Sequence, residues 1–207
     1  MTAFSDPRVL RRFIKLMLIL TAVMFVIWTG ITWYQGRVPG DFEVRQGDIK
    51  LSDGEYVEAI DRFDAALMDA PNHRGALLGK AAALMALEQY DDAEHVLTYT
   101  IDFLAETLTE DDPTGKGALS AAYANRGIIK DRQARYEDAL EDYVEAVKID
   151  YDLADGPGWI DHLLYYDKEP SSVLKRAEYL YKQLQLPEGE RLMQVPELDA
   201  KQRMYKP

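Results

Sequence analysis

Histidine and clustered carboxylates are the residue types in this sequence that could bind a metal or transfer a proton. His73, His95 and His162 do not share a helix face at the spacing of zinc ligands, so three isolated histidines are the simpler interpretation. Asp161 directly precedes His162, but adjacent residues on a helix point in different directions, which disfavours a base held by an orienting carboxylate. The acidic run 110–112 offers oxygen ligands for calcium, yet a solvated acidic loop explains it as well.

Other catalytic arrangements are missing from the sequence. None of the five serines lies in a Gly-x-Ser-x-Gly turn, and there is no glycine-rich loop of the kind that binds phosphate. The chain contains no cysteine, which excludes disulfides, zinc–thiolate sites and cysteine nucleophiles. We therefore expect a protein that is not an enzyme and that has no cofactor and no metal site.

Charge is distributed unevenly along the chain, whose formal net charge is −12. Five basic side chains and one acidic side chain give residues 1–37 a charge of +4 and leave −16 for the remainder. Binding to nucleic acid depends on lysine and arginine contacts with phosphate. The acidic body is therefore expected to bind no nucleic acid.

Residues 16–34 form an apolar run without a single charged side chain. A helix needs about 20 apolar residues to cross the hydrocarbon core, and Trp28, Trp33 and Tyr34 cluster at the far end, where aromatic rings favour the lipid headgroups. We therefore predict a transmembrane helix over 16–35. A cleaved signal peptide is one alternative, although its apolar core would be about 7–15 residues long and followed by small residues. A buried core helix is another, although no face of the run is polar.

Positive charge lies mainly before this span. Four basic residues fall within 1–15, whereas only Arg37 and Arg45 follow closely, interleaved with two acidic residues. The positive-inside rule then places the N-terminus in the cytoplasm and exports the rest of the chain. We predict a single-pass protein of a bacterial inner membrane, with a basic cytoplasmic segment at 1–15, a linker at 36–39 and a body in the periplasm.

Small residues and large apolar residues recur in one frame through the region 40–153. The second copy repeats the spacing of the first at a constant offset, and the third follows after an insertion. Small residues stand where two helices of a hairpin would touch, and aromatic residues stand where the hairpin would meet its neighbour. The recurring positions, copy by copy, are Gly47, Tyr56, Ala59, Phe63 and Ala66; then Ala81, Tyr90 and Ala93; then Gly127, Tyr136, Ala139, Tyr143 and Ala146.

This frame resembles that of the tetratricopeptide repeat (TPR), whose period of about 34 residues matches the offset from Gly47 to Ala81. The resemblance implies an all-α fold, in which an N-terminal transmembrane helix precedes a TPR solenoid of helical hairpins with C-terminal capping helices. Pro113, Gly115 and Gly117 predict a loop between the second and third hairpins. The resemblance then places three repeats at 40–73, 74–107 and 120–153, with an inserted loop at 108–119.

The remaining chain is expected to cover the open end of the stack. Residues 154–186 are predicted to form capping helices, because an uncapped solenoid exposes its core. The tail at 187–207 shows little periodicity but holds several apolar residues. We expect it to dock on the repeats or on a partner rather than to be disordered.

Members of the TPR family bind partners in a groove lined by the first helix of each hairpin. The resemblance places the partner-binding groove of this chain at Val44, Asp48, Leu51, Leu78, Ala82, Met85, Ala124, Ile128 and Asp131. The clamp that some members use to hold a C-terminal carboxylate is absent, because its positions are Val44, Asp48, Ala121 and Asn125 here. A hydrophobic or basic peptide would fit such a groove. The alternative is that the C-terminal segment of the chain fills it.

These features together predict a membrane-anchored scaffold that mediates protein–protein interaction. Its partners would be one or more proteins, including a membrane complex, and the lipid bilayer through residues 16–35. An accessory subunit or assembly factor of a membrane or periplasmic complex is the first hypothesis. A periplasmic chaperone that binds unfolded exported polypeptides, for example in cytochrome maturation, is the second.

Overall fold

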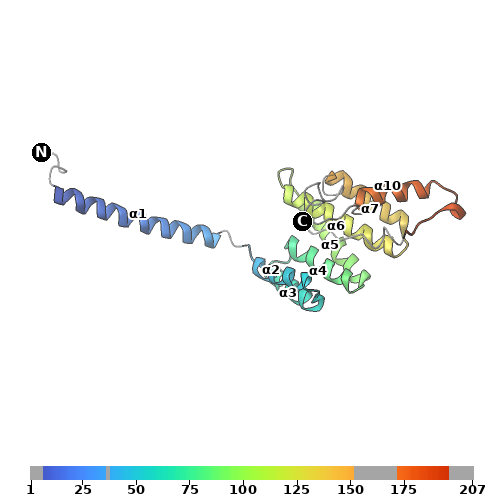
Figure 1. Cartoon of the computed structure of the whole chain (residues 1–207), viewed down its shortest axis with the longest axis horizontal. Coiled ribbons are helices and arrows are strands. Elements are labelled where there is room, and N and C mark those ends of the chain that lie inside the picture. The colour runs from blue at the N-terminus through green and yellow to red at the C-terminus, as the bar shows by residue number, and fades with distance from the viewer. Residues whose placement is uncertain (1–6, 36–37, 152–171, 196–207) are drawn as a thin grey trace. The chain divides into compact units, whose positions relative to one another are not determined.

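The computed structural model describes residues 7–35, 38–151 and 172–195. All regular elements in these ranges are helices, which confirms the predicted all-α class (Figure 1). The chain divides into two units, Met1–Pro39 and Gly40–Pro207. The first part of the predicted capping segment, 154–171, and the end of the tail, 196–207, lie outside the described residues, as does His162.

The first unit contains one helix, α1, Pro7–Gln35. It begins nine residues before the predicted start at residue 16, so the basic residues of the N-terminal segment are part of it. Its stretch Pro7–Thr32 is long and apolar enough to cross a membrane, and its most apolar part contains no buried residue. A signal sequence would meet the same criterion of length and composition.

The second unit is built from consecutive helical hairpins. Each helix packs against the next, and α4 also contacts α2 and α6, so the first helices of the hairpins form one layer (Figure 1). Helix α10 packs on α7 and is followed by a short 3₁₀ turn, η1. The bounds are α2 Asp41–Ser52 with α3 Tyr56–Asp69, α4 Arg74–Ala86 with α5 Tyr90–Thr107, α6 Pro113–Arg132 with α7 Tyr136–Ile149, then α10 Val173–Leu184 and η1 Glu188–Glu190.

The three hairpin turns share one hydrogen-bond pattern. In the first, the Gly54 amide donates to Leu51 and the Glu55 amide donates to the Lys50 carbonyl, which is the Schellman arrangement at a helix C-terminus. The residue at the turn is left-handed in every copy, with φ of 79° at Gly54, 59° at Glu88 and 60° at Ala134. Only the first copy carries the glycine that this conformation favours.

The turns therefore offer a matched pair of substitutions. Ala134→Gly is expected to raise the free energy of unfolding by about 1 kcal/mol, because a left-handed backbone strains an L-residue. Gly54→Ala is expected to lower it by a similar amount, since nothing lies within 4 Å of the added Cβ and backbone strain alone acts. Urea unfolding of each variant measures the change. If both substitutions changed the free energy of unfolding in the same direction, backbone strain at the turns would not be the cause.

The recurring small residues make room for rings. A Cβ added to Gly47 would lie 2.6 Å from the ring of Phe63, and one added to Gly79 would also overlap that ring. Phe63 is fully buried and so fills the space between α2 and α4. In the third hairpin, a Cβ on Gly127 would lie 2.7 Å from the Tyr143 ring. The hairpin interfaces are thus close-packed, with little space to spare.

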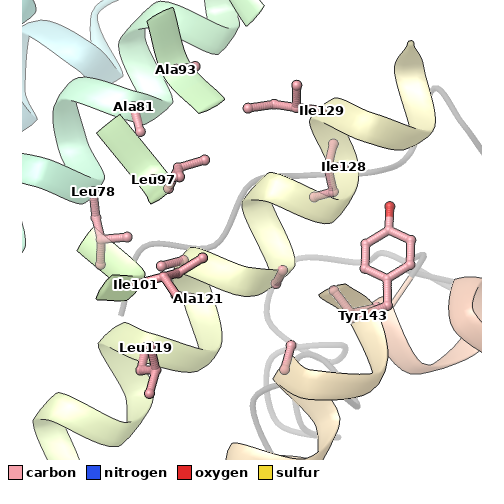
Figure 2. Close-up of a cluster of buried hydrophobic side chains, with 14 of the residues drawn as sticks. Leu78, Ala81, Ala93, Leu97, Ile101, Leu119, Ala121, Ile128, Ile129 and Tyr143 are labelled. Carbon is pink, nitrogen blue, oxygen red and sulfur yellow. The ribbon is translucent and has the colours of Figure 1, made fainter. Parts of the chain in front are cut away.

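Two clusters of buried side chains hold the hairpins together. The smaller joins α2, α3 and α4 around Phe63, and the larger extends from α4 to α10. Figure 2 shows part of the larger cluster, where Leu78 of α4 and Ile101 of α5 approach Ala121 of α6. All the predicted packing positions are buried except Tyr56, Tyr90 and Tyr136, which are half-buried at the starts of their helices.

The predicted loop at 108–119 is wrong in its second half, because α6 begins at Pro113. Proline is well suited to the first position of a helix, and Asp112 caps it by accepting a hydrogen bond of 2.8 Å from the Gly115 amide. Gly115 is buried there, and a Cβ would lie 2.5 Å from Leu108 Cδ1. This glycine is explained by close packing within a helix and not by a loop.

The Asp112 cap predicts a dependence of stability on pH. An ion pair and hydrogen bond of 2.6 Å with Arg74, and then the Gly115 amide, lower the pKa of the Asp112 carboxyl. A depressed folded-state pKa stabilises the protein fully above the unfolded pKa of about 4, and this stabilisation is lost as pH falls through the folded value. The melting temperature of the wild type minus that of Asp112→Asn should therefore be positive at pH 7 and shrink below pH 4. A difference that is constant with pH would contradict this role.

Candidate interaction groove

The groove residues predicted from the repeat frame lie on the first helices α2, α4 and α6. In the first hairpin, Asp48 and Leu51 are half-buried and Val44 is 8% exposed. Those of the second and third hairpins are buried, with exposures of 5% or less: Leu78, Ala82, Met85, Ala124, Ile128 and Asp131. The structure therefore brings the nine residues onto one layer of helices, but most of them contact the chain itself. Their binding of a partner stays a prediction.

Asp131, at the end of α6, is held by the C-terminal helix. Arg176 of α10 donates two hydrogen bonds of 2.7 Å to its carboxylate, and Tyr143 of α7 donates a third at 3.1 Å. The same guanidinium donates to the Met193 carbonyl at 2.9 Å. The exposures of Arg176 and Asp131 are 4% and 5%, so this is a buried, bidentate ion pair. Arg176 thus covers Asp131, one residue of the predicted groove, while its own helix α10 packs on α7.

Comparison with known proteins agrees with this architecture. The family model described as tetratricopeptide repeat matches residues 50–99. Among solved structures, the chain is similar to the first TPR of Spaghetti (RPAP3) bound to the HSP90 peptide SRMEEVD, with a TM-score of 0.51. The sequence identity is 16%, over 72% of this chain and 94% of that one. The second unit has a TPR fold. No curated protein matches the chain at a significant level.

A second buried charge cluster joins the two helices of the third TPR hairpin. Asp142 of α7 is 3% exposed and accepts bonds of 2.9 and 2.7 Å from Arg126, together with an ion pair of 2.8 Å from Lys130. Burial lowers the pKa of the Arg126 guanidinium, but the hydrogen bonds and charge of Asp142 outweigh it and leave that pKa raised. Arg126 also reaches Thr98 of the preceding TPR hairpin at 3.2 Å.

The sequence reasoning missed both clusters, although a signal was present. Arg176 lies on the apolar face of α10 between Val173 and Leu180, and Asp142 lies on the apolar face of α7. A charge at a core position of an amphipathic helix requires a buried partner of opposite sign. The helical period alone therefore points to these residues, though not to the identity of their partners.

Of the histidines in the TPR domain, His73 makes structural contacts. His73 caps α4, accepting from the Ala76 amide at 3.4 Å, and its other ring nitrogen lies 3.0 Å from Asp41. His95 is exposed. No group of three histidine, aspartate or glutamate residues that could hold a metal occurs in the described part of the chain. A TPR fold is typically a protein-interaction module, and the contacts of His73 suit a helix cap.

Proposed function

We propose that this protein is a membrane-anchored TPR scaffold that binds protein partners as an accessory subunit or assembly factor of a membrane or periplasmic complex. The observation that carries the proposal is the continuous layer of first helices α2, α4 and α6. A protein of the same fold has been solved with a peptide bound. We propose that partners bind on this layer at its more accessible positions, Asp48 and Leu51 of the first hairpin.

Anchoring through α1 is supported by its length and chemistry. At about 1.5 Å per residue, a helix of 29 residues is longer than the roughly 30 Å of the hydrocarbon core. The threonine hydroxyls inside it donate to backbone carbonyls of the same helix: Thr21 to Met17, Thr29 to Phe25 and Thr32 to Trp28. Polar groups satisfied within the helix are compatible with lipid. We propose that α1 holds the TPR domain at the membrane.

The chemistry of the groove favours a partner segment that is apolar or basic. The more accessible groove positions belong to the first hairpin, where Leu51 is apolar and Asp48 is acidic. The peptide in the similar structure, SRMEEVD, is acidic at its C-terminal end. A peptide of that kind would meet Asp48 instead of a cation in this chain. We therefore propose an internal, hydrophobic or basic segment as the ligand.

Stoichiometry separates the accessory subunit from the chaperone. After gentle detergent extraction of native membranes, an accessory subunit should purify with one partner in a fixed ratio, measured by quantitative mass spectrometry. Replacement of Leu51 by lysine should lower the recovered partner several-fold, because it places a charge in an apolar contact. Many exported proteins in small and variable amounts would favour the chaperone. If neither the wild type nor the Leu51→Lys variant recovered any partner, both functions would be contradicted.

Orientation is tested by reporter fusions after Pro207. Four basic residues precede the apolar stretch of α1, so we propose that the N-terminus is cytoplasmic and the TPR domain periplasmic. An alkaline phosphatase fusion is then expected to be active, because that enzyme needs an oxidising compartment for its disulfides. An active cytoplasmic reporter together with an inactive phosphatase fusion would reverse the orientation. Loss of residues 1–35 from the mature chain would favour a cleaved signal peptide.

A further inference from the structure

A continuous trough runs along α7, bordered by α10 and, at the end lined by Tyr123 and Arg126, by α6; its residues are other than those of the proposed groove. It consists of a hollow of about 260 Å³ and an adjoining one of about 650 Å³. Leu140, Val144 and Lys148 of α7 line both hollows, so the two form one surface. Because the trough uses the second helix of the third hairpin, it can be occupied independently of the groove.

The floor of the trough is apolar and open to solvent. Its α7 side carries Val144, which is 38% exposed, and its α10 side carries Tyr181, which is 59% exposed. Around them lie further apolar side chains, Leu140, Val147, Leu174, Ala177 and Leu184. Two adjacent helices with an apolar seam between them form the type of groove that accepts the apolar face of a third helix.

The rim of the trough is acidic. Five carboxylates and two basic side chains line the two hollows: Glu137, Glu141, Asp142, Glu145 and Glu178, with Arg126 and Lys148. Asp142 is paired with Arg126, and Glu145 is paired with Lys148 at 2.6 Å. Glu137 and Glu141 are exposed on successive turns of α7 and make no ion pair within the ranges that the structure describes. Their charges are available to a ligand.

We propose that the α7–α10 trough docks a basic amphipathic helix of a partner protein. The apolar stripe of that helix would lie on Val144 and Tyr181, and its lysine or arginine residues would lie against Glu137 and Glu141. Charge complementarity selects this partner, because an anionic lipid surface or a second acidic copy of this chain would be repelled by the rim. Docking here would leave the groove free, so the scaffold would hold two proteins at once.

A pair of designed peptides tests the proposal. The full-length protein in phosphatidylcholine nanodiscs is titrated with a short fluorescent helix that has leucine on one face and lysine on the other. The control peptide carries glutamate in place of lysine. Fluorescence anisotropy should show that the basic peptide binds and that the acidic control peptide does not. Glu137→Lys/Glu141→Lys should weaken binding about tenfold or more, whereas Glu58→Lys/Asp61→Lys on α3, with the same change in net charge, should leave it nearly unchanged.

The same peptides exclude attraction by net charge alone. Equal weakening by both double variants, or equal binding of the acidic peptide, would overturn the proposal. Because the chain contains no cysteine, a second measurement uses disulfide trapping in the otherwise unaltered protein. Val144→Cys should trap a basic peptide that carries cysteine in its leucine face, whereas Met68→Cys, at a site 83% exposed on α3, should not. Equal trapping at both sites would also overturn it.

Discussion

Phe63→Ala is expected to lower the free energy of unfolding by about 3–5 kcal/mol, the range for removal of a fully buried aromatic ring. The ring is completely buried and fills the space above Gly47 on α2 and Gly79 on α4. Neither glycine has a side chain that could move into the cavity. Removal of this one ring would therefore weaken the packing of the first hairpin on the second. Urea unfolding followed by circular dichroism measures the loss, and hydrogen exchange should show it in α2 and α3 first.

The second hairpin supplies a matched control for Phe63. There the corresponding pair is Ala81 of α4 with Leu97 of α5, and both are fully buried. Alanine takes the place of Gly47, and leucine takes the place of the larger Phe63. Gly47→Ala alone is expected to destabilise, because its Cβ would overlap the Phe63 ring. Combining Gly47→Ala with Phe63→Leu reproduces the second hairpin and should cost less than the sum of the single changes. Simple additivity would show that the glycine and the ring are not coupled.

Arg176→Met is expected to destabilise the protein by about 3–5 kcal/mol, the cost of leaving one partner of a buried ion pair without the other. The carboxylate of Asp131 would lose two hydrogen bonds of 2.7 Å while α10 still covered it. The Met193 carbonyl would lose a donor as well. We expect α10 and residues 191–195 to open from the third hairpin more often than in the wild type, which limited proteolysis and hydrogen exchange would detect.

The double variant distinguishes a lost ion pair from lost packing. Arg176→Met combined with Asp131→Leu removes both charges, and an apolar pair of similar volume is often as stable as a buried ion pair. We expect the double variant to recover at least half of the stability lost by Arg176→Met. Lys182→Met, on an exposed face of the same helix, serves as the control and should have little effect. A double variant no more stable than Arg176→Met would contradict the ion-pair account.

The architecture of the TPR domain could be predicted because its signals are local and repeated. The spacing of Gly47 and Phe63 reflects a contact between neighbouring helices, and the third hairpin repeats that contact between Gly127 and Tyr143. The start of α6 differs from the prediction because proline and two glycines usually mark a loop. In the folded chain the same residues serve as a first-turn proline and as close-packed positions.

The site was less predictable than the fold. A repeat frame places Asp131 on the first helix of its hairpin, but it cannot show that Arg176, 45 residues later, covers it. Such a contact depends on how the C-terminal helix returns to the stack, which no local pattern encodes. The acidic trough could not be predicted for the same reason, since α7 and α10 are separated in sequence by the chain between Ile149 and Val173. Both the ion pair and the trough can be recognised only in the folded structure.

The claim that a protein partner binds on the first-helix layer is tested most directly by photo-crosslinking in native membranes. A photoreactive amino acid is placed at Asp48 or Leu51 in the groove, and at Glu58 or Met68 on the outer helix α3 as controls. We predict one defined crosslinked protein from the groove positions and none from the α3 positions. No crosslink from the groove, or the same product from both sets of positions, would contradict the account.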